Sequence, residues 1–321
     1  MTTNTEMRVR VAAIEQVADH VKRFRFERVD GQLLPIFSGG AHVIVAMQDG
    51  KALRRNPYSL MSSPTDRSGY EISVLRVENS RGGSHFLHDK VMVGDELTVS
   101  QPVNLFPLDQ RARKNIFCAG GIGITPFMAM MDQLQQNNQN FELHYAVRTR
   151  SHGAYWNALQ EHYGKGRVKI YCDEEKLFIP TEALLCNQPL GTHLYVCGPV
   201  GMIKAVLSKA KKMGWPLQNL HSEEFLAPPP GNPFKAILQK SHKTIEVQSH
   251  QSILEAAEEA GVDAPYLCRG GACGQCETNV ESCHGTIEHN DHFLEENEKS
   301  SGTKIMICVS RISGSEITLD L

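Results

Sequence analysis

The sequence contains no apolar run approaching the roughly 20 residues that a membrane-spanning helix needs, so it gives no sign of a membrane anchor. It also has no basic run with interleaved aromatic residues, which argues against a nucleic-acid-binding surface. The N-terminus, MTTNTEMRVRVAAIEQ, alternates polar and apolar residues and lacks the continuous apolar core of a signal peptide. With 41% hydrophobic and 21% charged residues, we expect a globular protein of the cytoplasm.

The sequence also lacks the closely spaced cysteines, even in number, that form a disulfide framework. The nine cysteines are an odd number spread through 321 residues, which is unlike a small secreted disulfide scaffold. In a reducing compartment, clustered cysteines more often bind metal. The length itself predicts two or three domains, each large enough to bury a core.

The charge is unevenly distributed along the chain. The formal net charge is −3, but residues 234–321 contain 14 acidic and 7 basic residues and the remainder carries a net charge of +4. Such asymmetry suggests electrostatic docking, either between domains or onto a basic partner. The alternative is a solvated acidic surface without a partner.

The pattern of apolar, polar and turn-forming residues changes along the chain and divides it into four segments. Residues 1–108 contain short alternating runs such as HVIVAM and YEISVLRV, which predict an antiparallel β-barrel or sandwich, and we expect the barrel. Residues 109–226 alternate apolar strands with helical stretches, which predicts an α/β nucleotide-binding domain with a parallel sheet. Residues 227–233 form a proline-rich linker. Residues 234–321 begin with a strand pair, FKAILQ and KTIEVQ, followed by a helix, SILEAAEEAGV.

Two glycine-containing breaks lie in the second segment. In KNIFCAGGIGITPFMAMMDQL a glycine loop separates a strand from a helix, with Thr125 as the expected N-cap and Pro126 in the first turn. Such a helix N-terminus can hold a pyrophosphate, although a tight turn without a ligand is the alternative reading. In HLYVCGP a second strand breaks at Gly198, and Pro199 opens a helix that ends near Gly214.

Both breaks are expected at the carboxyl edge of the sheet, where ligands bind in open α/β folds. By the same reasoning Asp173, which directly follows the strand VKIYC, could accept hydrogen bonds from a ribose diol and repel a 2′-phosphate. That role favours NADH over NADPH. An exposed loop aspartate without a ligand is the alternative.

The stretch CRGGACGQC combines three cysteines with very small residues. Cys268, Cys273 and Cys276 have the spacing C-x4-C-x2-C, and Cys308 follows after 31 residues in the apolar stretch KIMICVSR, expected as a strand. This spacing is typical of plant-type [2Fe-2S] ligands, and glycine lets backbone N–H groups approach the sulfur atoms. Structural zinc would need a second paired motif, and a Rieske centre would need two histidines. Cys283 competes with Cys308 for the fourth position.

Four motifs in order, NPYSL, RGGS, GGIGITP and YVCGP, resemble those of the ferredoxin-NADP reductase superfamily. The resemblance implies that Ser59 lies near flavin N5, that Tyr58 packs beside the isoalloxazine, and that Thr125 and Cys197 line the nicotinamide site. Asn56 occupies the family's arginine position, which leaves Arg55, Arg76 and Arg81 as candidates for the flavin phosphate. The implied flavin contacts are Asn56, Tyr58, Ser59, Leu60, Val74, Arg76, Gly82, Gly83, Ser84 and Phe225. The implied nucleotide contacts are Gly120, Gly121, Gly123, Thr125, Pro126, Asp173, Cys197, Gly198 and Pro199.

The order of the modules, ending in a C-terminal plant-type ferredoxin with a β-grasp fold, resembles the phthalate dioxygenase reductase family along the whole chain. This resemblance implies FMN, a [2Fe-2S] cluster and NADH, with electrons passing from NADH through FMN and the cluster to a terminal oxygenase that docks near the acidic ferredoxin domain. No general acid, general base or covalent nucleophile is expected.

Within the family, the sequence is similar to reductases of quaternary-amine, carnitine-type Rieske monooxygenases. A haem-type or other monooxygenase as partner is one alternative. A non-enzymatic metal-binding interaction module, in which the glycine loops are only turns, is another.

Overall fold

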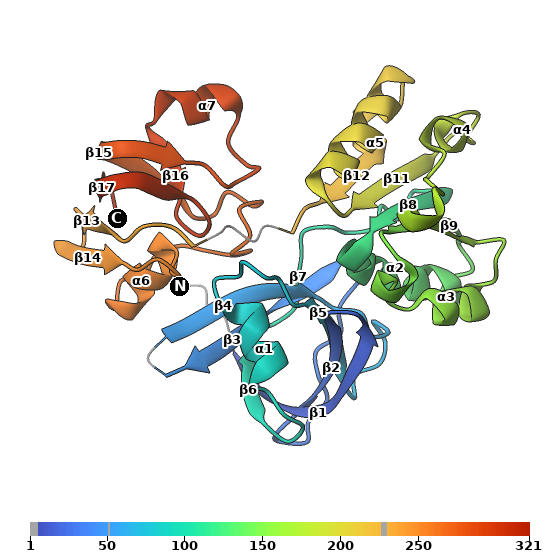
Figure 1. Cartoon of the computed structure of the whole chain (residues 1–321), viewed down its shortest axis with the longest axis horizontal. Coiled ribbons are helices and arrows are strands. Elements are labelled where there is room, and N and C mark those ends of the chain that lie inside the picture. The colour runs from blue at the N-terminus through green and yellow to red at the C-terminus, as the bar shows by residue number, and fades with distance from the viewer. Residues whose placement is uncertain (1–5, 51, 226–229) are drawn as a thin grey trace. The chain divides into compact units, whose positions relative to one another are not determined.

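The computed structural model of the chain describes residues 6–50, 52–225 and 230–321 (Figure 1). By their internal contacts the residues form two compact units. The first unit comprises Met1–Val43, Tyr58–Arg76 and Val91–Phe225, and the second comprises Ile44–Pro57, Val77–Lys90 and Leu226–Leu321. Residues 227–229 of the expected proline-rich linker lie outside the described residues, as does residue 226, and the domain boundaries expected at 108 and 226 stay a prediction.

The N-terminal part of the chain forms one seven-stranded sheet. Strand β1 pairs antiparallel with β2 and β6, β2 with β5, and β3 with β7. Along β1 the side chains of Val9 and Val11 are fully buried while their neighbours face outward, which is the alternation expected of a strand with one face in a core. The predicted antiparallel β-barrel is confirmed. Its strands are β1 (Met7–Ala18), β2 (Val21–Arg28), β3 (Ala41–Asp49), β4 (Ala52–Ser59), β5 (Tyr70–Leu75), β6 (Glu96–Val99) and β7 (Val103–Asn104).

Five parallel strands in the order β10-β9-β8-β11-β12 form the sheet of the nucleotide domain, as predicted. Helices α2 and α3 contribute to the core on one side of this sheet, and α4 and α5 to a second core. The strands are β8 (Lys114–Gly120), β9 (Asn140–Val147), β10 (Val168–Cys172), β11 (Thr192–Cys197) and β12 (Leu220–Glu223). The helices are α2 (Thr125–Gln136), α3 (Trp156–Tyr163), α4 (Thr181–Leu185) and α5 (Val200–Lys212).

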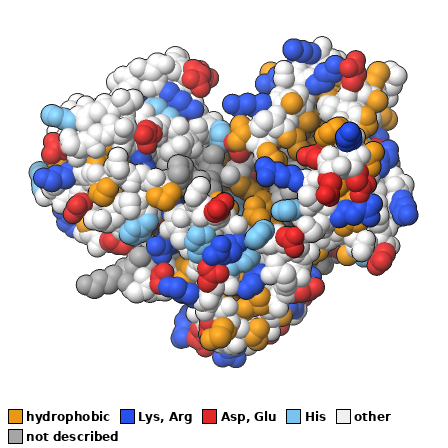
Figure 2. Space-filling model, in the orientation of Figure 1, with side chains coloured by type: hydrophobic (Ala, Val, Ile, Leu, Met, Phe, Trp, Pro, Cys, Tyr) orange, Lys and Arg blue, Asp and Glu red, His pale blue; other side chains and the backbone are white. Residues whose placement is uncertain are grey.

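Helix α5 has a basic end. Its last turn contains Lys209, Lys211 and Lys212, and Lys and Arg side chains gather around it on the face shown in Figure 2. These cations account for part of the positive excess outside residues 234–321.

Within the first unit, helix α2 packs directly against two glycines of the loop before β3. A β-carbon on Gly39 would lie 2.7 Å from the Cα atom of Met130, and one on Gly40 would lie 2.0 Å from the carbonyl oxygen of Phe106. The Gly39 N–H also donates to Oε1 of Gln133 at 2.7 Å. Because the backbone of α2 contacts Gly39 directly and the Met130 side chain lies against Gly40, α2 packs closely on the barrel residues of this unit.

The C-terminal part of the second unit has a β-grasp arrangement, with strand order β14-β13-β17-β15-β16. The predicted strand pair is present, since β13 runs antiparallel to β14, and β13 also pairs in parallel with β17. The predicted helix begins after Ser252, whose hydroxyl caps it in a capping box with Glu255. The elements are β13 (Phe234–Leu238), β14 (Lys243–Val247), α6 (Ile253–Glu259), β15 (Glu277–Glu288), α7 (Glu296–Ser301), β16 (Lys304–Met306) and β17 (Arg311–Leu319).

Two local predictions were wrong. Thr125 is the first residue of α2 instead of its N-cap, and its hydroxyl donates to the Ile122 carbonyl at 3.0 Å, closing the short 3-10 turn η1 (Gly121–Ile124). Cys308 lies in a turn instead of a strand, because β16 ends at Met306, whose carbonyl accepts hydrogen bonds from the N–H groups of Val309 and Ser310.

None of the helices in the described parts of the chain is long and apolar enough to cross a lipid bilayer.

Candidate functional site

The glycine loop after β8 lies against the end of the neighbouring strand β11. The two strands are paired in parallel, with Ala119 opposite Cys197, so both loops leave the sheet at its carboxyl edge. A β-carbon on Gly123 would lie 2.3 Å from the Cys197 carbonyl oxygen, and one on Gly198 would lie 2.9 Å from the Gly120 Cα atom. The glycines are therefore required for contact between two backbones, a reason that the sequence motif alone does not reveal.

This edge of the sheet is where the predicted nucleotide contacts come together. Gly120, Gly121, Gly123, Thr125 and Pro126 form the β8–α2 connection, and Thr125 is 1% exposed. Cys197, Gly198 and Pro199 form the β11–α5 connection beside it. The N-terminal N–H groups of α2 and α5 carry positive partial charge, which suits an anionic ligand such as a pyrophosphate.

Glu223 is a half-buried glutamate with a buried Oε2 atom, and sequence reasoning missed it. It is the register partner of Cys197 on the adjacent strand β12, and desolvation by burial raises its pKa to about 8. Burial, together with the nearby carboxyls Glu223 and Glu224, raises the pKa of the Cys197 thiol well above its ordinary value. Both side chains are therefore neutral near pH 7. The only signal in the sequence was the pair of glutamates before Phe225, which is typical of a solvated strand end.

The remaining predicted contacts of the first unit are more exposed. Asp173 directly follows β10 and opens the short helix η3 (Asp173–Glu175), with its side chain facing solvent. Phe225 is 42% exposed. Glu175, two residues after Asp173, pairs with Arg150 from the loop after β9, so the loops that follow β9 and β10 meet where Asp173 lies. This is a suitable place for the ribose of a bound dinucleotide.

The predicted flavin contacts are divided between the two units. In the first unit, Ser59 is 7% exposed, Leu60 and Val74 are buried, and Tyr58 and Arg76 are half-buried. The second unit contains Asn56, Gly82, Gly83 and Ser84.

In the second unit, Asn56 and the glycine loop are brought together. The Asn56 amide nitrogen is 2.3 Å from the place that a Gly83 β-carbon would occupy, and Gly82 has a left-handed φ of 109°. The Ser84 hydroxyl accepts a hydrogen bond from the Val77 N–H at 3.3 Å. Two motifs that are separate in the sequence are thus in contact in the structure. Because residues 82 and 83 have no side chains, a phosphate can reach their backbone N–H groups.

The four predicted cluster ligands form one contiguous set of thiols. Hydrogen bonds with Cys273 and then Cys308 lower the pKa of Cys268, and Cys276 is hydrogen-bonded to Cys308. The Gly270 N–H points at the Cys268 sulfur at 3.3 Å, and the N–H groups of Ala272 and Gln275 are directed at the set as well. Converging thiols with N–H donors fit a cluster whose sulfur atoms carry negative charge.

Cys283, the competing fourth ligand, has different surroundings. It lies in β15 opposite Ile317 and packs against the ferredoxin core, whereas Cys308 contacts Cys268 and Cys276. The geometry therefore favours Cys308.

Comparisons with known proteins agree with the predicted ferredoxin domain and with the reductase family that the sequence motifs resemble. A sequence family described as "2Fe-2S iron-sulfur cluster binding domain" matches residues 236–313, and "Dimethylamine monooxygenase subunit DmmA-like, N-terminal domain" matches residues 99–220. The carnitine monooxygenase reductase subunit of Acinetobacter baumannii is 44% identical over 97% of this chain and 96% of its own length. The heme-dependent oxidative N-demethylase beta subunit of Ectopseudomonas mendocina is 43% identical over 99% and 100%. The solved structure of phthalate dioxygenase reductase, which covers 99% and 98%, superposes with a TM-score of 0.91 at 34% identity.

Proposed function

The chain belongs to the phthalate dioxygenase reductase family, and we propose that its electron acceptor is the Rieske non-haem iron component of a monooxygenase acting on a quaternary amine such as carnitine. It is an NADH-dependent oxidoreductase with FMN and a [2Fe-2S] cluster. The flavin accepts hydride from NADH and can release the two electrons singly, which matches a one-electron cluster. The observation that supports this acceptor is the full-length similarity to a carnitine monooxygenase reductase subunit, at 44% identity.

A haem-dependent oxidative N-demethylase is the second candidate acceptor, because its beta subunit is 43% identical over 99% of this chain. Reconstitution tests both. The chain is mixed with NADH and either the oxygenase component of a carnitine monooxygenase or the haem subunit of an N-demethylase, and substrate loss is measured with NADH oxidation. We expect carnitine turnover with the former. Turnover with the haem enzyme alone would support the second candidate, and turnover with neither would contradict both.

For the cluster, we propose Cys268, Cys273, Cys276 and Cys308 as the ligands, since hydrogen bonds link these thiols in the order Cys273, Cys268, Cys308, Cys276. Cys308→Ser should lose the cluster absorbance, while Cys283→Ser should keep it. The reverse result would make Cys283 the fourth ligand.

For NADH, we propose that the β8–α2 and β11–α5 connections hold the pyrophosphate and nicotinamide, with Thr125 and Cys197 lining the ring. The neutral Cys197 and Glu223 side chains would keep this side of the nicotinamide site uncharged. Asp173 would accept from the ribose hydroxyls and reject a 2′-phosphate. Asp173→Ala should therefore improve the use of NADPH relative to NADH, and unchanged selectivity would contradict the assignment.

For the flavin, we propose that Ser59 donates near N5, that Tyr58 packs against the ring, and that Gly82, Gly83 and Ser84 bind the phosphate. Two of the candidate arginines, Arg55 and Arg81, already pair with carboxylates of α6. Backbone and hydroxyl donors would then supply most of the phosphate contacts.

For the partner, we propose a docking surface made of Ala272, Gln275, Phe293, Glu295 and Glu296. Ala272 and Gln275 of the cluster loop are exposed, and Phe293, 45% exposed, has its ring against Gly274. Glu295 and Glu296 are exposed beside it and form part of the acidic excess of residues 234–321. An exposed aromatic ring next to anionic groups suits a partner with a basic patch.

Charge reversal tests this surface. Glu295→Lys combined with Glu296→Lys should raise the KM for the oxygenase by about tenfold at low salt and leave NADH-dependent dye reduction unchanged. The matched control is Glu246→Lys, an exposed glutamate on β14 at the opposite edge of the sheet. An equal effect in the control would show that only net charge matters. We also propose a cytoplasmic location, where the nine thiols stay reduced.

A further inference from the structure

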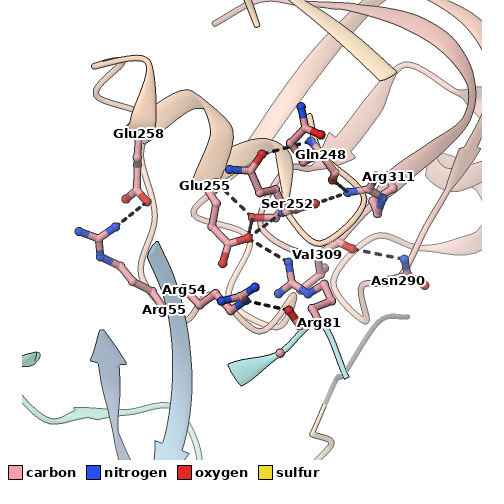
Figure 3. A network of polar contacts seen from close by, with 12 residues as sticks. Arg54, Arg55, Arg81, Gln248, Ser252, Glu255, Glu258, Asn290, Val309 and Arg311 are labelled. Atoms are coloured by element: carbon pink, nitrogen blue, oxygen red, sulfur yellow. Dashed lines mark hydrogen bonds and ion pairs between the residues drawn. The ribbon is translucent and has the colours of Figure 1, made fainter. Parts of the chain in front are cut away.

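Two ion pairs connect β4 and the glycine loop after β5 to helix α6 within the second unit (Figure 3). Nη1 of Arg55 lies 3.3 Å from Oε2 of Glu258, and Nη1 of Arg81 lies 2.9 Å from Oε2 of Glu255. The four side chains are at most 21% exposed, so water screens these pairs less than it screens a surface ion pair. Both carboxylates belong to the ferredoxin segment, whereas Arg55 directly precedes the motif NPYSL and Arg81 is the first residue of RGGS.

The second oxygen of Glu258 binds another arginine. Oε1 of Glu258 accepts a hydrogen bond from Nη2 of Arg269, the residue directly after the cluster cysteine Cys268. Arg269 is 6% exposed, its backbone has a left-handed φ of 51°, and its guanidinium lies 3.8 Å from the ring centroid of Tyr266. A non-glycine residue in this conformation is held there by its surroundings, and the paired guanidinium supplies that restraint.

Glu258 therefore bridges two segments that matter for electron transfer. Arg55 directly precedes Asn56 in the flavin motif, and Arg269 begins the cluster loop. The ring of Pro57 also lies beside the cluster loop, because its Cγ atom is 3.9 Å from the position of a Gly270 β-carbon. Pro57 is followed by Tyr58, the proposed flavin contact.

The second pair has a different environment. Oε2 of Glu255 also accepts from the Ser252 N–H at 2.7 Å and the Ser252 hydroxyl at 3.1 Å, so this carboxylate caps α6. Arg81 receives a further contact at its carbonyl from Nε of Arg54, at 2.8 Å. The Arg81–Glu255 pair thus fixes the helix, whereas the Arg55–Glu258–Arg269 bridge acts on the cluster loop itself.

We propose that Glu258 is a positioning residue that holds the cluster loop against the flavin strand and thereby sets the rate of electron transfer from flavin to cluster. The step is the passage of one electron of the NADH-derived pair, and its rate falls steeply as donor and acceptor separate. Without the carboxylate, the buried Arg269 charge loses its anion and the loop has no charged contact to Arg55. Glu258 takes no part in hydride transfer. The proposal rests on the flavin and cluster assignments above.

Anaerobic stopped-flow mixing with NADH tests this role, because flavin bleaching and cluster bleaching are followed at separate wavelengths. In Glu258→Gln we expect flavin reduction to be unchanged and cluster reduction to be slower by about tenfold, equivalent to about 1.4 kcal/mol. The matched control is Glu259→Gln on the same helix, whose exposed carboxylate pairs with Gln251. Equal cluster reduction in wild type and Glu258→Gln would overturn the proposal, as would equal slowing of both phases.

Hydrogen exchange gives a second readout that does not depend on turnover. Amides of residues 54–56 and 269–272 should exchange faster in Glu258→Gln and not in Glu259→Gln. If Glu258→Gln loses its cluster, Arg55→Gln is measured instead, and its rate of cluster reduction is divided by its own rate of flavin reduction. A ratio equal to that of wild type would overturn the proposal. Failure of the ligand assignment is seen separately, as retention of the cluster in Cys308→Ser.

Discussion

Replacing Gly123 by alanine should separate the two loops that form the proposed nicotinamide site. The new β-carbon would lie 2.3 Å from the oxygen and 2.5 Å from the carbon of the Cys197 carbonyl, and 2.7 Å from the Gly198 nitrogen. All three are backbone atoms, so no side-chain rotation can relieve the contact. To restore an ordinary contact distance of 3.4 Å, β8 and β11 must move apart by about 1 Å at their carboxyl ends.

A displacement of about 1 Å in a site that orients two reacting groups can lower the rate by about 100-fold. We therefore expect kcat/KM for NADH-dependent flavin reduction to fall by about 100-fold in Gly123→Ala, equivalent to about 2.7 kcal/mol of transition-state stabilisation. The assay is flavin bleaching in anaerobic stopped flow over a range of NADH concentrations. Reduction of the cluster by dithionite should be unaffected, because the ferredoxin core is separate.

Gly166→Ala is the matched control. Gly166 is exposed in the turn before β10, and nothing is within 4 Å of its β-carbon position. A methyl group there meets no neighbour, so the control should be neutral or slightly stabilising. Gly123→Ala with a rate within about threefold of wild type would refute the close-packing argument, provided that its circular dichroism is unchanged.

Three further predictions concern stability and salt. Glu255→Ala removes the capping box and the partner of Arg81, which should cost about 2–3 kcal/mol and lower the apparent Tm of the cluster signal by roughly 10–20 °C; no change in Tm would contradict the network. Glu223 stays protonated in the fold up to a pKa of about 8, against 4.5 when exposed, so its stabilising contribution is full below pH 4.5 and is lost as the pH rises through 8. The apparent Tm of Glu223→Gln minus that of wild type should therefore increase between pH 5 and pH 8. A difference in Tm that stays constant over this range would contradict the expectation. Raising the salt from about 0.05 to 0.5 M should weaken turnover with the oxygenase while leaving the internal flavin-to-cluster rate within about twofold, since exposed charges are screened more than buried ones.

The sequence was sufficient for the features that depend on local pattern. The alternation around Val9 and Val11 predicted a barrel strand, and the cysteine spacing predicted a set of thiols that does converge. It was insufficient where a role depends on what another segment contributes. Thr125 looked like an N-cap, but its hydroxyl bonds backward to Ile122, and Cys308 looked like a strand residue, but the strand ends two residues earlier.

The charged residues of the second unit show why sequence reasoning missed the Glu258 bridge. In the sequence, Glu255 and Glu258 contribute to one acidic total along with Glu295 and Glu296. In the structure, the first two are directed at arginines 174 to 203 residues away, and the last two face solvent. Burial therefore divides one acidic excess into carboxylates paired with internal arginines and carboxylates exposed to solvent, a difference that net charge does not show.

This separation has a physical advantage for an electron-transfer protein. A docking surface must release its partner after each electron, so weak, screened and exposed charges suit it. An internal contact between donor and acceptor must persist through many such encounters, so partly buried pairs with Arg55, Arg81 and Arg269 suit it better. If all the carboxylates were exposed, a basic partner could compete for those that hold the cluster loop. Because α6 keeps Glu255 and Glu258 engaged with internal arginines, partner binding and internal electron transfer can vary independently.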